Sequence, residues 1–183
     1  MTHTDKALVG HQAVVDWMGT RVRTLADLIP SSPRAIVVGI NPAPRSVEVG
    51  HYYQGQLGQQ FFGRLRSSGV LDTAEHEWED DAAYASGIGF TDVIKRPTRS
   101  ADELSAEEYA FGIPALRERI EHSAPRLVIF TFKKTAEKLL GRFEGSGRLA
   151  ARLGDAAVFV MPAPYAAGSI VMRQLADLRE VFD

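Results

Sequence analysis

Ala35-Ile36-Val37-Val38-Gly39 is the stretch that decides the fold: an apolar, mostly β-branched run that follows Pro33 and ends at a glycine. A strand with one solvated face alternates polar and apolar residues, so an unbroken apolar run predicts a strand buried on both faces, as in a parallel sheet. Residues 127–130 and 157–161 are two further runs of this kind. The sequence therefore predicts at least three buried parallel strands.

Helical patterns alternate with these strands. An apolar stripe at Phe61, Phe62, Leu65 and Val70 predicts one helix, and Ser105 with Glu108 forms a capping box for another. The latter should run to about residue 122, with Pro114 bending or splitting it. Two more helices are expected over residues 134–141 and 170–181. This alternation predicts a single-domain three-layer α/β/α sandwich with a mostly parallel central sheet, over residues 1–183.

Composition narrows the function classes. The 183 residues include no cysteine, which excludes disulfides, thiolate metal sites and a cysteine nucleophile. No apolar stretch approaches the roughly 20 residues that span a bilayer, and no signal-peptide pattern opens the chain, so we expect a cytoplasmic protein without membrane contact. The net charge of -2 does not favour nucleic-acid binding. However, residues 67–116 carry eleven acidic against three basic side chains, which leaves both flanking regions basic. The acidic run over residues 75–81 is expected to be a solvated face that points away from any DNA.

Two loops at strand ends have unusual compositions. Ligands bind beyond the carboxyl ends of parallel strands. Two segments lie at such ends: residues 41–58, which show no helical period, and residues 162–169. Pro42 disfavours a helical conformation at Asn41 and holds that residue extended. The carboxamide of Asn41 can orient a water molecule. The competing interpretation is that Asn41 only turns the chain and that Tyr52 and Tyr53 anchor the loop.

Four motifs in order decide between these interpretations. They read GINP from Gly39, GHYY from Gly50, GQQFFGRLRSSG from Gly58 and GIGFTDVIKRPT from Gly87. The chain resembles the mismatch-specific uracil/thymine DNA glycosylase family over about residues 24–183. The resemblance implies a monofunctional enzyme that hydrolyses the N-glycosidic bond of uracil in DNA by base flipping, as the first step of base excision repair. Mispaired thymine stays open as a further substrate.

The resemblance also implies roles for individual residues. Asn41 matches the catalytic asparagine that positions the hydrolytic water. Tyr53 matches the aromatic residue that stacks on the extruded base, and Ile40 and Ser46 match residues of the base pocket. The segment that enters DNA corresponds to Ala163, Pro164, Tyr165, Ala166, Ala167, Gly168 and Ser169. Neither a metal nor an organic cofactor is implied. The expected partner is uracil-containing duplex DNA, with single strands left open, and we expect a monomer that associates with the nucleoid when bound to DNA.

Physical reasoning supports such a site. Base extrusion costs a few kcal/mol and is easiest at a mismatch. An amide is not a strong base, so the departing pyrimidine must leave as an anion stabilised by backbone N–H groups. Four other side chains are candidates. His51 could assist base departure or be a surface residue, Asp92 could act as a general base or pair with Lys95 or Arg96, and Lys133, with Lys134, could contact phosphate or begin a solvated helix.

The second loop departs from the family pattern. Bacterial members carry Asn-Pro-Ser-Gly where this chain has Ala163-Pro164-Tyr165-Ala166, and vertebrate relatives insert an arginine where Ala167 stands. Selectivity for the opposite guanine therefore does not follow from the resemblance. The alternatives are a glycosylase for another deaminated base such as hypoxanthine or xanthine, a silent nucleic-acid or nucleotide-binding module of the same fold, and a phosphate-binding enzyme. The last lacks a P-loop.

Overall fold

The computed structural model describes residues 7–182. Its central sheet has five strands in the spatial order β4 (Ile88–Asp92), β3 (Ala35–Gly39), β5 (Leu127–Phe130), β7 (Ala156–Val160) and β6 (Gly147–Leu153). The first four are mutually parallel, and β6 pairs antiparallel with β7 at the edge. The three strands expected from the apolar runs are confirmed, and they occupy the middle of the sheet.

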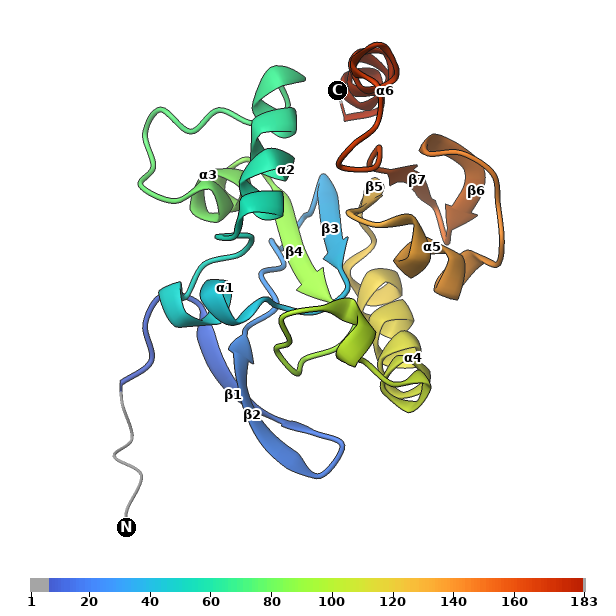
Figure 1. Ribbon diagram of the computed structural model, residues 1–183. Coiled ribbons are helices and arrows are strands. Elements are labelled where there is room, and N and C mark those ends of the chain that lie inside the picture. The colour runs from blue at the N-terminus through green and yellow to red at the C-terminus, as the bar shows by residue number, and fades with distance from the viewer. Residues whose placement is uncertain (1–6, 183) are drawn as a thin grey trace.

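Helices cover both faces of this sheet (Figure 1). One hydrophobic cluster packs Ala35 and Val37 against α1 (Pro44–Val49), α2 (Gln56–Ser67), α3 (Glu79–Ala85) and α6 (Gly168–Phe182). The other packs Ile36 and Val38 against α4 (Ala106–Ser123) and α5 (Lys133–Leu140). Because successive residues of a strand point to opposite faces, the wholly apolar β3 feeds both clusters. The predicted three-layer α/β/α arrangement is confirmed.

A separate hairpin, which the sequence patterns did not predict, precedes the sheet. It pairs β1 (Gln12–Trp17) with β2 (Thr20–Leu25), and Trp17 at its end belongs to the cluster beneath α4. A short 3₁₀ helix, η1 (Ala101–Glu103), lies between β4 and α4. No helix within residues 7–182 is both long and apolar enough to cross a membrane.

The structure confirms one of the local sequence predictions and corrects two others. The capping box of Ser105 and Glu108 is confirmed, and α4 runs through Pro114 without being split. The expectation of a loop without helix over residues 41–58 is wrong, because α1 begins at Pro44, a residue suited to the first helical position, and α2 begins at residue 56. The acidic run is also not wholly solvated, since Asp80 at the start of α3 is buried.

Candidate active site

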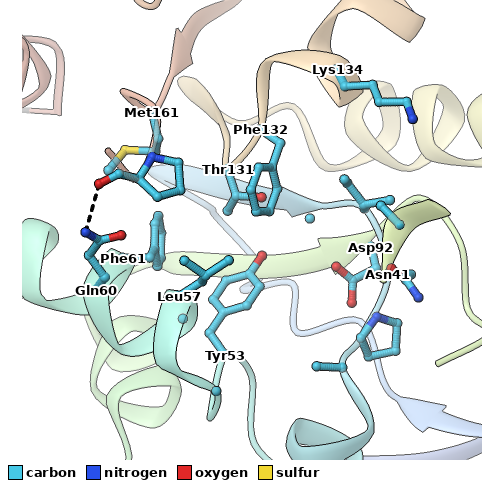
Figure 2. Close-up of a pocket in the computed structure, with 18 of the residues that line it drawn as sticks. Asn41, Tyr53, Leu57, Gln60, Phe61, Asp92, Thr131, Phe132, Lys134 and Met161 are labelled. Atoms are coloured by element: carbon cyan, nitrogen blue, oxygen red, sulfur yellow. Dashed lines mark hydrogen bonds between the residues drawn. The ribbon is translucent and has the colours of Figure 1, made fainter. Parts of the chain in front are cut away.

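A cavity of about 900 Å³ opens at the carboxyl ends of β3, β4, β5 and β7. Its wall is built from the segments that follow these strands, together with the start of α2: residues 39–43, Asp92, residues 98–102, 131–134, 161–164 and 55–58. Figure 2 draws part of this wall, with Asn41 and Asp92 on one side and Phe61 and Met161 on the other. The site therefore lies at the edge where parallel α/β sheets bind ligands.

Asn41 stands at the end of β3 with its amide group held in place. Its Nδ2 donates to the carbonyl oxygen of Arg96 at 2.9 Å and to Oγ1 of Thr98 at 2.8 Å. Both amide hydrogens are thereby used, so the group that the side chain can offer the cavity is the acceptor Oδ1. The amide is preorganised to accept a hydrogen bond from a water molecule or a ligand.

Tyr53 presents an aromatic ring to the cavity from an unusual backbone conformation. Its φ is 58°, in the left-handed region, where a bulky residue is strained. The ring is held at its edges by Phe61, Phe62 and Phe90, with centroids 5.2, 5.9 and 5.8 Å away. Gly58 permits this placement, because a Cβ there would lie 2.1 Å from the carbonyl oxygen of Tyr53.

Ser46 and Ile40 also line the cavity. Ser46 is buried, and its Oγ accepts a hydrogen bond from the backbone N–H of Gln54 at 3.0 Å, which fastens the loop that carries Tyr53. Ile40 is 8% exposed and is anchored through its carbonyl oxygen to the N–H of Ile94. Both residues thus belong to the cavity wall, and the hydroxyl group of Ser46 is already engaged with the protein.

Asp92 is a buried carboxyl group in the cavity wall at the end of β4. Its Oδ1 has no hydrogen-bond partner among the described residues. Gly39 makes room for it, since a Cβ at residue 39 would lie 2.1 Å from Asp92 Oδ1 and 2.9 Å from the Tyr53 hydroxyl. Asp92 therefore faces the same corner of the cavity as the aromatic ring.

The protonation of Asp92 follows from its burial and from the positions of the nearby cations. Lys95 Nζ is 2.5 Å from Asp27 Oδ1, and Arg119 Nε is 3.0 Å from Asp27 Oδ2, so both cations pair with Asp27 instead. Burial raises the pKa of Asp92 from 3.8 to about 7; Asp27 adds to the rise, while Lys95 and Arg119 oppose it. The expected alternative, a pairing of Asp92 with Lys95 or Arg96, is wrong, because Arg96 pairs with Glu108 at 2.7 Å.

The loop after β7 is tied to α2. Arg64 donates to the carbonyl oxygens of Pro162 at 2.5 Å and Ala163 at 3.0 Å, and Gln60 donates to that of Pro164 at 3.0 Å. Tyr165 follows these anchors and is 94% exposed, so its ring does not pack under the last helix. Of the seven residues expected to form this loop, Gly168 and Ser169 instead begin α6, while Ala163 and Pro164 line the cavity.

Besides Arg64, three basic residues lie at the cavity. Lys133 and Lys134 open α5, and Arg99 lies on the segment before η1. Lys133 also reaches Glu137 at 3.7 Å and lies over the ring of Phe143 at 5.2 Å, so it is partly engaged within its own helix. The sequence had singled out Lys133 and Lys134, but Arg99 carried no signal apart from its place after the GIGFTDVIKRPT motif.

The expected role of His51 in base binding requires correction. Although it lies two residues before Tyr53, its ring stacks on Trp78 at 4.3 Å and its Nδ1 contacts Asp80 Oδ1 at 2.8 Å, outside the cavity wall. The sequence patterns also did not identify Arg64, because its position on the predicted helix does not indicate that it holds the opposite loop.

These features define an α/β/α protein with a cavity that combines an oriented amide, a buried carboxyl group with a raised pKa and an aromatic wall. A family model, the uracil DNA glycosylase superfamily, matches residues 26–179. The chain belongs to this superfamily. Among its relatives is the G/U mismatch-specific uracil DNA glycosylase of Schizosaccharomyces pombe (strain 972 / ATCC 24843), which is 30% identical over 145 residues. The match covers 73% of this chain and 44% of the relative, so the chain spans less than half the length of that protein.

Proposed function

We propose that the protein is a DNA glycosylase that hydrolyses the N-glycosidic bond of uracil flipped out of DNA into this cavity. The observation that carries the proposal is Asn41, whose amide is fixed by Arg96 and Thr98 so that Oδ1 is directed to a water or ligand. A module that only bound nucleic acid would have no need of an oriented acceptor in a cavity of this depth. Membership of the superfamily supports the same activity.

In this proposal the residues act in sequence on the flipped nucleotide. The ring of Tyr53 stacks on the base, which offsets part of the cost of extrusion by roughly 1–3 kcal/mol. Asn41 Oδ1 holds the water that attacks the sugar carbon as the bond to the base nitrogen breaks, and the proton that this water loses passes to solvent or to the departed base. The transition state has oxocarbenium character, and the electron pair of the broken bond leaves with the base as an anion.

Asp92 would meet the edge of the base. It shares a corner of the cavity with the Tyr53 ring, through the gap left by Gly39, and so lies beside the stacked base in this arrangement. A neutral carboxyl group carries one donor and one acceptor, which match the carbonyl oxygen and N–H of a uracil edge. An ionised carboxylate there would repel the departing anion. The raised pKa thus suits the proposed chemistry.

DNA would approach across the cavity opening. Lys133, Lys134 and Arg99 would contact phosphates, and the exposed ring of Tyr165 would fill the space left by the flipped nucleotide. This arrangement supplies no arginine or asparagine from residues 163–169 to read the opposite guanine.

The test is cleavage of short duplexes carrying uracil, thymine, hypoxanthine or ethenocytosine opposite guanine or adenine, followed by alkali to break the abasic strand. Uracil release is expected, with thymine a poor substrate. Release of hypoxanthine in preference to uracil would move the substrate class to deaminated purines. No release of any base under conditions where the DNA is bound would contradict the proposed activity.

A further inference from the structure

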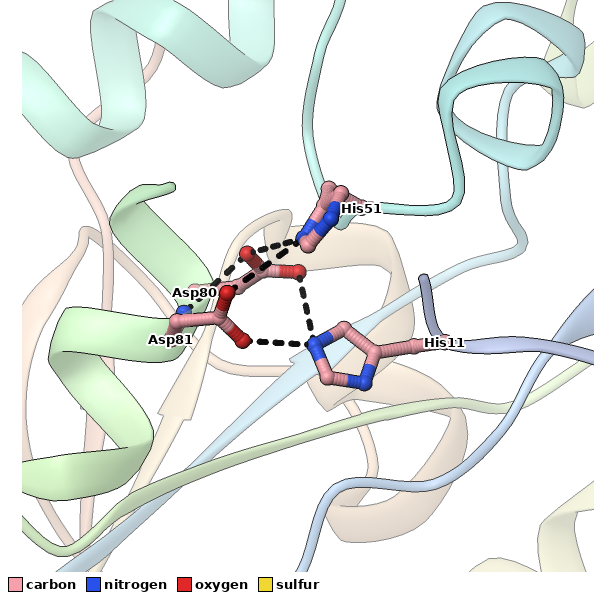
Figure 3. Close-up of side chains that lie close together, drawn as sticks. All are labelled: His11, His51, Asp80 and Asp81. Atoms are coloured by element: carbon pink, nitrogen blue, oxygen red, sulfur yellow. Dashed lines mark hydrogen bonds and ion pairs between the residues drawn. The ribbon is translucent and has the colours of Figure 1, made fainter. Parts of the chain in front are cut away.

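A second cluster of chemically active side chains lies outside the cavity. His11, His51, Asp80 and Asp81 come from three separate segments and converge so that one ligand atom of each lies within 4.8 Å of all the others (Figure 3). His11 precedes β1, His51 lies between α1 and α2, and the two aspartates open α3. We propose that these four residues form a structural binding site for a divalent metal ion of the zinc type.

The ligand set has the chemistry that such an ion selects. Two imidazole nitrogens and two carboxylate oxygens are typical ligands of four-coordinate zinc, with bonds of about 2.0–2.2 Å. Two neutral imidazoles and two carboxylates balance the charge of a divalent cation. The salt bridges described for Asp80 and Asp81 within residues 7–182 are all to these two imidazoles, so no lysine or arginine neutralises the pair there. Buried carboxylates are ordinarily paired or bound to metal, and Asp80 has no exposed surface.

The distances fit an ion at the centre. His11 Nε2 lies 2.7 Å from Asp81 Oδ1 and 4.0 Å from Asp80 Oδ2, and His51 Nδ1 lies 2.8 Å from Asp80 Oδ1 and 4.0 Å from Asp81 Oδ2. Ligand atoms around a tetrahedral zinc ion are about 3.4 Å apart, which follows from its bond lengths. These four contacts involve both oxygens of each carboxylate, and with one ligand atom per residue the separations reach up to 4.8 Å, so the widest pair needs to close by up to about 1.4 Å while the short contacts open. Rotations of the partly exposed His11 and Asp81 side chains can supply most of this change.

The surroundings already hold the ligands in place. Asp80 accepts hydrogen bonds from the backbone N–H of Tyr52 at 2.7 Å and of Asp81 at 3.1 Å, the kind of outer-shell support that orients a ligating carboxylate. Trp78 stacks on the His51 ring with an interplanar angle of 10° and shields it from solvent. The N–H of His11 donates to the carbonyl oxygen of Gly50 at 2.7 Å, which joins two of the three segments independently of any ion.

A bound ion would have a consequence for the cavity. Tyr52 is held by Asp80 and is followed directly by Tyr53, which stands in the cavity wall. By fastening the segment before β1, the loop at His51 and the start of α3 to one another, the ion would fix the loop that presents the Tyr53 ring. The ion itself would stand outside the cavity and take no part in bond cleavage.

The test is a titration of the chelator-treated full chain with Co²⁺, followed by Zn²⁺. We expect one Co²⁺ per chain with the intense visible absorption of tetrahedral coordination, its displacement by Zn²⁺, and a rise in the thermal unfolding midpoint when Zn²⁺ is added. Asp81→Asn and His11→Asn remove the two more exposed ligands and should each weaken Zn²⁺ binding at least tenfold, with loss of the midpoint rise. The matched control is His122→Asn, which alters an exposed histidine on α4 and should bind as the parent does.

Two results would overturn the proposal. One is the absence of stoichiometric binding by the folded parent chain, which would leave the cluster as a pair of histidine–aspartate hydrogen bonds. The other is a Zn²⁺ affinity and midpoint rise in Asp81→Asn and His11→Asn equal to those of His122→Asn. Because each readout is binding or stability, the result is independent of whether the chain cleaves uracil.

Discussion

Asp92 is the residue at which structure and proposed chemistry are most closely linked. Its neighbours Lys95 and Arg119 are both drawn to Asp27, which leaves a buried carboxyl group with an unpartnered oxygen in the cavity wall. Such an arrangement costs stability and is characteristic of functional sites, where a group is tuned to a task. The pKa of about 7 makes its protonation state, and hence its role, accessible to experiment.

The first prediction concerns the pH dependence of base release. Asp92 is neutral below pH 7 and ionised above it, so the single-turnover rate on a uracil duplex should fall as pH rises through about 7. Asp92→Asn, which cannot ionise, should lose this decline while keeping activity. A parent rate that rises through the same range would instead identify Asp92 as a general base that activates the water.

The raised pKa also fixes the sign of a stability effect. The folded chain retains a proton that the unfolded chain has lost, so the stability contributed by Asp92 is lost as pH rises from about 4 through 7. Asp92→Asn should therefore be more stable than the parent by a margin that grows to a few kcal/mol by pH 8. Denaturant unfolding at pH 5 and pH 8 measures this margin, and a margin that shrinks with pH would contradict the assignment.

A further prediction at the residue scale separates the ring of Tyr53 from its hydroxyl. Tyr53→Ala should reduce uracil release by the roughly 1–3 kcal/mol that base stacking contributes, whereas Tyr53→Phe keeps the ring and should be nearly as active as the parent. Phe at this position also removes a buried hydroxyl without a partner among the described residues. Equal losses in the two variants would show that the ring does not stack on the base.

At the scale of elements, the loop after β7 is held by α2 and carries Tyr165 outward. Because Gln60 and Arg64 fix the carbonyl oxygens of residues 162–164, Tyr165 can enter a duplex without first being ordered. Tyr165→Ala should slow release of uracil from duplex DNA severalfold and leave release from single strands nearly unchanged, since a single strand has no stacked gap to fill. Tyr84→Ala, an exposed tyrosine on α3, is the control.

The same loop predicts little selectivity for the opposite base. With no arginine or asparagine in residues 163–169, initial rates on U·G and U·A duplexes should be similar. A preference for U·G of a hundredfold or more, or a T·G rate close to the U·G rate, would show that another element reads the mismatch.

The strands differ in how well the sequence alone predicts them. β3, β5 and β7 were predictable because their residues are uniformly apolar, whereas β4 contains Gly89, Thr91 and Asp92. Gly89 is required by tertiary contact, since a Cβ there would lie 2.5 Å from the carbonyl oxygen of Leu28, which bridges to Phe90. Contacts of this kind have no local signature.

For the site residues too, those within local motifs were predictable, whereas those placed by contacts between distant segments were not. Asn41 and Tyr53 were accessible through their motifs and Ser46 through the family resemblance, and all three line one cavity. His51 was placed in the base pocket and Asp80 on a solvated face because their mutual contact joins residues 29 positions apart in the chain. The pairing of Asp27 with Lys95 and Arg119 spans 68 and 92 residues and likewise depends on the fold.

For the whole molecule, the distribution of charge matters more than its net value of -2. The acidic run over residues 75–81 lies outside the cavity wall, while Lys133, Lys134 and Arg99 contribute to that wall. Binding to a uracil-containing duplex should therefore weaken steeply between 50 and 200 mM salt, in proportion to the phosphates contacted. Lys134→Ala should reduce this slope by about one unit. Affinity that does not change with salt would point to a small-molecule ligand.

The central claim is that Asn41 positions water for hydrolysis, and the most direct measurement is the single-turnover rate of Asn41→Ala on a U·G duplex. The account predicts a loss of at least tenfold, with duplex affinity and the thermal unfolding midpoint close to those of the parent. Thr98→Val removes one of the two acceptors that hold the amide and should give a smaller loss. A folded Asn41→Ala protein that releases uracil as fast as the parent would contradict the account.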